Sequence, residues 1–189
     1  MENISKSEFK KTRIDEAISR QKKQRLLVWI LIILLLVVAI GGIFWYKKTN
    51  QKNLPGQFVA DQGREHVGAT HQHTYSSNPP TSGPHFPSTA EWGIYKEELP
   101  DETIIHNLEH GGIWISYKPD IKPEIKKKLE DFYDKWGRKV IVTPRLKNDS
   151  DIALAAWTRL DKFSATEYSE ERIEKFIRAY RNKGPEFVP

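Results

Sequence analysis

The sequence contains no cysteine, and its single methionine is Met1. Disulfide bonds are therefore excluded as a source of stability, although a location outside the cytoplasm would permit them. Thiolate and thioether metal ligands are excluded as well, and these are the ligands that Cu⁺ prefers. Any metal site in this chain must be built from imidazole, carboxylate, backbone or water.

Charge is absent from Leu26 to Trp45, a run of twenty almost entirely aliphatic residues. A helix of this length spans about 30 Å, the thickness of a bilayer's hydrocarbon core. We therefore expect a single transmembrane helix over residues 26–46. A cleaved signal peptide would have an apolar region of about 7–15 residues and a small-residue cleavage site after it. The longer run favours an uncleaved signal-anchor.

Positive charge on the N-terminal side of this run predicts its orientation. Residues 1–25 hold eight Lys or Arg and four acids, whereas only Lys47 and Lys48 follow the run directly. The positive-inside rule then places the N-terminus in the cytoplasm of a single-pass cell-membrane protein. The chain after the span is expected to be extracytoplasmic.

The formal net charge of +5 belongs to the segments that flank the apolar run. Residues 1–48 carry a net charge of +6, and residues 49–189 carry −1. The basic flanks suit anionic lipid headgroups, so membrane lipid is an expected partner. A nucleic-acid partner is not expected, because the folded part lacks a basic surplus. The sequence identifies no protein partner.

These observations predict four parts of the chain: a cytoplasmic basic tail (1–25), a transmembrane helix (26–46), a linker (47–58) and an extracytoplasmic domain (59–189). Within the last part, residues 59–100 hold five prolines, four glycines and four histidines, with little regular periodicity. They also carry aromatic residues, which disordered linkers usually lack. We expect a long, ordered loop that wraps onto the domain and carries function.

From Leu99 the pattern becomes regular and predicts a small α+β domain. Periodicity and capping residues indicate a short helix over 102–110, a strand over 112–117, a helix over 121–136, a strand over 139–143, a strand over 152–160 beside it, and a last helix after Ser169. Apart from the short helix, the order is β-α-β-β-α. The expected fold is a sandwich with two helices on one face of an antiparallel or mixed sheet.

All six histidines fall between residues 66 and 110. Histidine is the commonest metal ligand in proteins, so this clustering indicates a metal site. A plainer alternative is that these are loop histidines bonded to the backbone, since closeness in sequence need not mean closeness in space. His71 and His73 form an H-x-H pair, which would place both rings on one face of an extended segment.

The run from His106 to His110 (HNLEH) contains a second possible pair of metal-binding histidines. On a helix, His106 and His110 share a face. The run also matches H-x-x-E-H, the motif of metalloproteases in which the glutamate activates a metal-bound water. Gly111 and Gly112 end the segment at once, and the domain is small for a protease, so a metal-dependent hydrolase is the third interpretation.

Pro79 to His85 (PPTSGPH) predicts a rigid loop that presents His85 in a fixed direction, because proline restricts its own backbone and that of the residue before it. Ser82 lies in the same loop. No strand–serine–helix elbow surrounds it, so an esterase nucleophile is not expected.

Three stretches together resemble the bacterial family catalogued as domain of unknown function 3105: SNPPTSGPHFP (77–87), WGIY (92–95) and HNLEHGG (106–112) running into ISY. The resemblance covers about residues 66–119 and implies a bacterial protein with one N-terminal membrane segment. It implies no activity. The positions that match the family pattern are His66, Pro80, Ser82, Gly83, His85, His106, Glu109, His110 and Gly111. His71 and His73 are less typical of it.

The combined prediction is a membrane-anchored domain that binds a divalent transition metal, Zn²⁺ or Cu²⁺, through His85, His106 and His110, with His66 or Glu109 completing the set. Three ligands and an open position would permit catalysis, whereas four would make a structural or carrier site. The alternative is a non-enzymatic surface interaction module whose histidines are structural. No catalytic residue is assigned, and a non-enzymatic role is favoured.

Overall fold

The computed structural model describes residues 6–52, 54–186 and 188. The chain forms two compact units, which divide in sequence between residues 53 and 54. We describe each unit separately.

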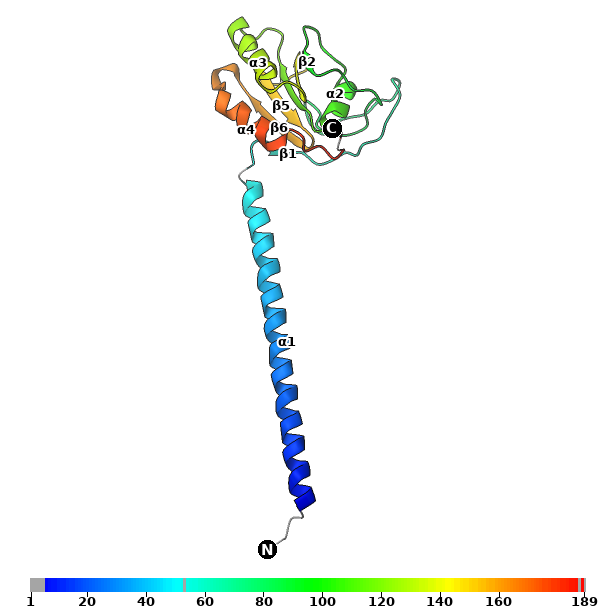
Figure 1. Ribbon diagram of the computed structural model, residues 1–189. Coiled ribbons are helices and arrows are strands. Elements are labelled where there is room, and N and C mark those ends of the chain that lie inside the picture. The colour runs from blue at the N-terminus through cyan, green and yellow to red at the C-terminus, as the bar shows by residue number, and fades with distance from the viewer. Residues whose placement is uncertain (1–5, 53, 187, 189) are drawn as a thin grey trace. The chain divides into compact units, whose positions relative to one another are not determined.

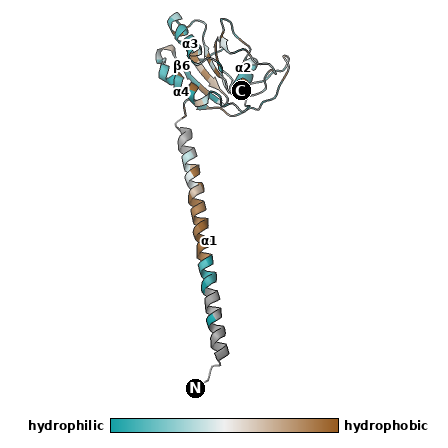
Figure 2. Ribbon diagram, viewed as in Figure 1, coloured by the Kyte–Doolittle hydropathy of each residue, from teal (hydrophilic) through white to brown (hydrophobic). Residues whose placement is uncertain are grey.

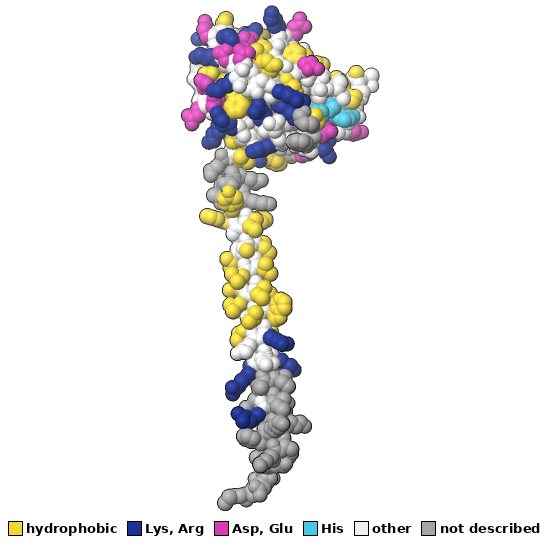
Figure 3. Space-filling view, viewed as in Figure 1, with side chains coloured by type: hydrophobic (Ala, Val, Ile, Leu, Met, Phe, Trp, Pro, Cys, Tyr) yellow, Lys and Arg dark blue, Asp and Glu magenta, His cyan; other side chains and the backbone are white. Residues whose placement is uncertain are grey.

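The first unit is one long helix, α1 (Lys6–Lys52). Its segment Arg20–Tyr46 is 27 residues long and exposed, and it contains the charge-free apolar run that begins at Leu26. Figure 2 shows this apolar band in the middle of α1, and Figure 3 shows Lys and Arg side chains beside it on the N-terminal side. By length and composition, it is the one helix in the described part of the chain that could cross a membrane. The helix extends beyond the expected span of 26–46 in both directions.

The second unit is built on one mixed six-stranded sheet (Figure 1). Its strands, in spatial order, are β1 (Gln57–Phe58), β6 (Arg159–Phe163), β5 (Ile152–Ala156), β3 (Ile113–Tyr117), β4 (Val140–Pro144) and β2 (Gly93–Ile94). The pairs β3–β4 and β4–β2 are parallel, and the remaining neighbours are antiparallel. The expected α+β class, with an apolar helix before the sheet domain, is confirmed.

Helices α3 (Pro123–Trp136) and α4 (Glu170–Tyr180) pack on one face of this sheet. Proline begins α3, and Gly137, at φ +60°, ends it. The Ser169 side chain accepts the backbone N–H of Arg172 and so caps α4. The apolar residues of both helices lie against Ile113, Ile115 and Tyr117 of β3, which alternate along the strand and therefore point to the same side.

The opposite face is covered by helix α2 (Asp101–Glu109) and by the long loop before it. Ile104 and Leu108 of α2 pack on Trp114 of β3 and on Ile141 of β4. The loop adds Trp92 and other partly buried residues to this cluster. The expected ordered loop is therefore present, and it forms a layer over the sheet together with α2.

The sheet differs from the prediction in several ways, the first being that the short strands β1 and β2 were not predicted. Residues 152–160 do not form one strand: the chain turns back after Ala156, because Thr158 adopts φ +58° and lies in the left-handed region, and β5 and β6 form a hairpin. Strand β5 also lies beside β3, with β4 on the other side of β3. The segment after β4 crosses the end of the sheet, since the backbone N–H of Arg145 bonds Tyr117 of β3 at 2.8 Å.

Pro100 occupies the N-cap position of α2, and no side chain caps this helix. The Asp101 carboxylate instead binds the buried guanidinium of Arg145, at 2.8 Å from Nε and 2.7 Å from Nη2. Arg145 Nη1 also donates to the side-chain oxygens of Asn78 and Asn148. This network ties the start of α2 to the segment that follows β4, and so fixes the helix that carries the site.

The beginning of the second unit is held by its last helix. The Tyr180 hydroxyl of α4 donates a hydrogen bond of 2.6 Å to the carbonyl of Pro55. Gly56 follows at φ +72°, and a side chain there would lie 2.9 Å from the Leu160 carbonyl. Strand β1 then pairs with the first two residues of β6.

Candidate metal centre

Two distant parts of the long loop run side by side and place two histidines together. The backbone N–H of Val67 donates to the carbonyl of His85 at 2.8 Å, and the N–H of His85 donates to Glu65 at 2.9 Å. These bonds form an isolated parallel bridge between His66 and His85. The bridge fixes the two imidazoles next to each other without any longer strand.

Gly83 makes the turn that leads into His85. Its φ is +119°, and a side chain there would meet the Tyr75 ring at 3.0 Å. The Tyr75 hydroxyl closes the same turn by donating to the Pro84 carbonyl at 2.6 Å. Ser82 is buried and accepts the backbone N–H of Gln62 at 3.0 Å. Its hydroxyl therefore holds the loop in shape, which agrees with the argument against an esterase nucleophile.

Helix α2 supplies the other two members of the cluster, because His106 and Glu109 lie three residues apart on one face. The loop is bonded to this helix through its backbone: Phe86 N–H donates to the Glu102 carbonyl at 3.2 Å. The Asn107 side chain bonds both the N–H and the carbonyl of Ala90, at 2.9 and 2.8 Å. Loop and helix therefore have one fixed relative position.

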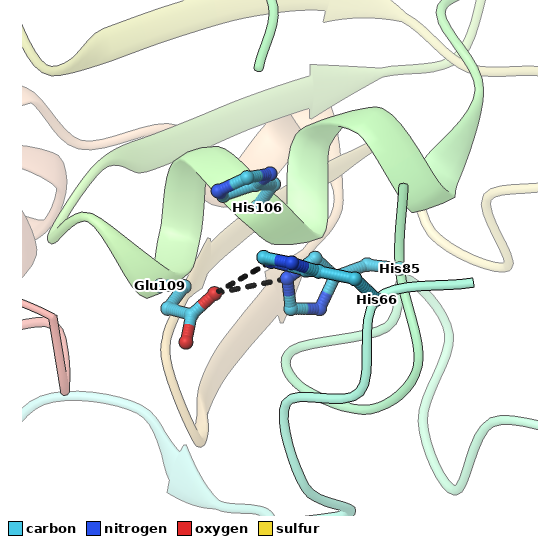
Figure 4. A group of neighbouring side chains, drawn as sticks. All are labelled: His66, His85, His106 and Glu109. Carbon is cyan, nitrogen blue, oxygen red and sulfur yellow. Dashed lines mark ion pairs between the residues drawn. The ribbon is translucent and has the colours of Figure 1, made fainter. Parts of the chain in front are cut away.

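His66, His85, His106 and Glu109 converge, as Figure 4 shows. One potential ligand atom from each lies within 4.8 Å of the others. The three imidazole centroids form a nearly equilateral triangle, with separations of 5.0, 4.9 and 5.0 Å. Four of the five residues that the sequence analysis selected are thus brought together.

The two buried histidines are oriented by backbone carbonyls. His85 Nδ1 lies 2.8 Å from the carbonyl oxygen of Gly83, and His106 Nδ1 lies 2.8 Å from that of Phe86. A carbonyl only accepts, so each Nδ1 carries the proton and donates. In neutral rings the Nε2 lone pairs are then left available. Metal-binding histidines commonly have this arrangement, with the second nitrogen donating to a carbonyl or carboxylate.

His85 Nε2 lies 2.9 Å from Glu109 Oε2, and both side chains are almost fully buried, at 0% and 4% exposure. Neither atom has a hydrogen-bond partner of ordinary geometry among the described residues. If His85 is neutral, two acceptors face each other in a dry environment, which is unfavourable unless a positive charge lies between or beside them. A proton or a metal cation would satisfy both atoms.

Burial lowers the pKa of His106, the hydrogen bond to Phe86 opposes this shift, and the positive charges that His110, His85 and His66 can carry lower the pKa further. Burial, together with the neighbouring imidazoles, therefore lowers the pKa of His106 and favours its neutral form. A neutral imidazole is the form that binds metal.

The cluster reaches solvent on the side of His66, whose side chain is 49% exposed. Arg64 lies on the same side, with Nη1 3.5 Å from Glu109 Oε1. The two oxygens of Glu109 thus have different neighbours. Oε1 faces the guanidinium of Arg64, and Oε2 faces His85 and, at 4.0 Å, His66. Histidine side chains are visible at the surface of this unit in Figure 3.

Comparison with known families gives a match to the one described as "Protein of unknown function (DUF3105)", over residues 66–188. This stretch is most of the second unit and more than half of the chain. The chain belongs to the DUF3105 family. No curated protein and no solved structure matches it. The DUF3105 match begins at His66, the first residue of the cluster.

His110, the fifth selected residue of the DUF3105 domain, lies outside this group of four. Its ring centroid is 4.5 Å from that of His106, but its Nε2 points to Glu186 Oε2 at 3.2 Å. His106, His110 and Glu186 form a second group whose ligand atoms lie within 4.8 Å of one another. Glu186 was not selected from the sequence, since it follows the last helix in a segment without any motif.

His71 and His73 belong to neither group of described ligand residues. Their ring centroids are 6.4 Å apart, and His73 Nε2 lies 3.2 Å from the side-chain nitrogen of Gln62. The H-x-H pair therefore lies on the exposed loop, apart from the cluster.

Proposed function

We propose that this DUF3105 domain binds one divalent transition metal ion, Zn²⁺ or Cu²⁺, through His66, His85, His106 and Glu109. The contact between His85 Nε2 and Glu109 Oε2 carries the proposal, because with a neutral His85 it leaves two buried acceptor atoms facing each other. A divalent cation between the four side chains would remove this electrostatic cost.

The kind of ligand supports these metals. Three imidazole nitrogens and one carboxylate oxygen suit Zn²⁺ and Cu²⁺, and hard oxygen-seeking ions such as Mg²⁺ are disfavoured. Tetrahedral Zn²⁺ holds its ligand atoms about 3.3 Å apart, given bonds of about 2.0–2.1 Å. The four atoms lie within 4.8 Å of one another, so small side-chain rotations would bring them to that spacing.

Four protein ligands favour a structural or carrier role over catalysis. Two of the ligands come from the long loop and two from α2, so a bound ion would join these two layers. The interaction-module and hydrolase alternatives remain outcomes of the experiment below. The interaction module would be a folded domain that binds no metal. The hydrolase would have an open coordination position with Glu109 beside a metal-bound water.

We also propose that α1 anchors this domain to the outer face of the cell membrane. The segment Arg20–Tyr46 contains an apolar run that is long enough to span a bilayer, and this run is not buried. The excess of positive charge in residues 1–25 supports a cytoplasmic N-terminus, and the basic flanks support contact with anionic lipid. Reporter fusions at each end of the chain, assayed for enzyme activity inside and outside the cell, would test this orientation.

Metal binding is tested on the full-length, tag-free protein in detergent by calorimetric titration with Zn²⁺ and Cu²⁺. We expect one ion per chain, bound with submicromolar affinity. His85→Ala and His106→Ala should each weaken binding at least 100-fold, whereas the matched loop variant His71→Ala/His73→Ala should bind as the wild type does. Equal binding by all variants, or no binding by the folded wild type, would overturn the proposal.

A further inference from the structure

Beside the proposed metal site, a second set of ligands shares one of its residues. His106, His110 and Glu186 place one potential ligand atom each within 4.8 Å of the others. We call them the outer set, and His66, His85, His106 and Glu109 the inner set. Because His106 Nδ1 is bonded to the Phe86 carbonyl, its Nε2 is the nitrogen available to either set, and it can bind one ion at a time.

The outer set is held in place by backbone bonds. Asn182 N–H donates to the Gly111 carbonyl at 2.8 Å, and Glu186 N–H donates to the Glu109 carbonyl at 3.1 Å. Between them, Gly184 lies so close to α2 that a side chain there would overlap the Glu109 carbonyl. The segment after α4 is therefore fixed against the end of α2, with the Glu186 carboxylate directed at His110.

The two sets differ in access to solvent. In the outer set the side chains of Glu186 and His110 are 48% and 16% exposed, whereas in the inner set His66 is 49% exposed and His85 and Glu109 are almost fully buried. His110 also lines an open cavity of about 560 Å³, together with Thr89, Glu91 and Trp92. An ion in solution can thus meet the outer set without displacing any part of the loop.

The number of ligands makes the outer set the weaker of the two. It offers three ligands where the inner set offers four. Each set has a cationic neighbour, since the Lys139 amine donates to the His110 carbonyl at 2.6 Å and Arg64 Nη1 lies 3.5 Å from Glu109 Oε1. A cation that arrives at the outer set is therefore retained less strongly than one among the inner ligands.

We infer that the outer set is an entry position, which takes a divalent transition metal ion from solvent and passes it to the inner set through His106. This inference rests on the proposed metal binding by the inner set. In the transfer the ion keeps its bond to His106 Nε2, releases His110 and Glu186, and gains His85, His66 and Glu109. No electron or proton has to move for this exchange.

The test is the rate of Cu²⁺ binding to the full-length protein in detergent, followed by stopped-flow tryptophan fluorescence. The Trp157 ring lies 6.4 Å from that of His85, so Cu²⁺ in the inner set should quench it. We compare wild type with His110→Ala/Glu186→Gln, and with His71→Ala/Glu171→Gln as a matched variant outside both sets. Removal of Cu²⁺ by excess chelator gives the dissociation rate.

We expect the His110/Glu186 variant to bind Cu²⁺ at least tenfold more slowly and to release it more slowly by a similar factor, so that Kd changes less than threefold. This pattern follows because an entry position lies on the path in both directions. Unchanged rates in the variant would overturn the inference and leave the inner site intact. A faster release with a raised Kd would also overturn it, since His110 and Glu186 would then be ligands of one common site. No Cu²⁺ binding by the wild type would instead contradict the proposed function.

Discussion

Asn107 and Ala90 are joined by two hydrogen bonds, one in each direction. The Asn107 amide accepts the N–H of Ala90 and donates to its carbonyl, at 2.9 and 2.8 Å, in a position that is 1% exposed. The Asn107 side chain thus bonds the backbone of this stretch of loop in the way that a neighbouring strand would. His106, which directly precedes Asn107, is a proposed ligand. The fold and the site therefore both depend on the contact between Asn107 and Ala90.

Asn107→Ala should lower the free energy of unfolding by about 2 kcal/mol, because two buried hydrogen bonds are lost and the Ala90 groups are left without partners. Urea unfolding of the metal-free protein measures this. Asn107→Asp, which keeps the acceptor and loses the donor, should also be destabilised. Equal stability of Asn107→Ala and wild type would show that the loop is held by other contacts.

The Arg145–Asp101 pair should be similarly sensitive. Arg145→Ala leaves a largely buried carboxylate without its partner, and we expect a loss of about 3–5 kcal/mol. Arg145→Lys keeps the charge but cannot reproduce the two parallel bonds from Nε and Nη2, so it should recover only part of the stability. In a double-mutant cycle with Asp101→Asn, the two losses should be clearly less than additive; additive losses would contradict a direct interaction.

Alkaline pH should weaken the fold through Tyr117. Burial, followed by the nearby Glu130 charge, raises the pKa of Tyr117 to about 12. An unfolded tyrosine loses its proton near pH 10, so the folded state holds more protons between these values. The stability that protonated Tyr117 contributes is fully present below pH 10. It is lost as pH rises to about 12, and the loss is at most about 3 kcal/mol.

Tyr117→Phe should reduce this alkaline loss. Near neutral pH it should leave stability equal or higher, since the buried Tyr117 hydroxyl has no hydrogen-bond partner among the described residues. Unfolding free energies of both proteins at pH 7 to 11 provide the comparison. An identical pH dependence in the variant would assign the effect to other tyrosines.

Metal should stabilise the domain by an amount that grows with the logarithm of the free metal concentration. An ion that binds only the folded state adds about 2.7 kcal/mol at a free concentration 100 times Kd. Hydrogen exchange should locate the gain at the bridge between His66 and His85, where the amides of Val67 and His85 are bonded across two loop segments. The control is the His85→Ala variant, in which the same Zn²⁺ concentration should raise stability by less than about 0.5 kcal/mol.

The sequence predicted the class of the fold, and its five candidate ligands, chosen with the help of the family resemblance, include the four residues of the cluster together with His110, which lies outside it. Helical and strand periodicity places α3, β3, β4 and α4, and the concentration of histidine directs attention to the loop and to α2. The pairing of β5 with β3 could not be predicted in this way. It depends on where the chain runs after β4, and that path is set by Arg145 and its partner Asp101, 44 residues apart.

The histidines illustrate the same limit. His106 and His110 share a face of the predicted helix, yet α2 ends at Glu109, and His110 turns toward Glu186. Glu186 lies 76 residues further along the chain and has no motif around it. Its position follows from the close packing of Gly184 against α2, a three-dimensional contact that leaves no local trace in the sequence.

The hydrogen bond between Tyr180 and Pro55 gives the domain a defined response to mechanical force. Tension along the chain from α1 enters the second unit at Leu54, and it first meets this bond and the two-residue pairing of β1 with β6. These contacts pass the force to α4 and β6. The proposed ligands begin at His66 and are held by the loop and α2. The pairing of β1 with β6 can therefore break under force before the positions of the histidines are disturbed.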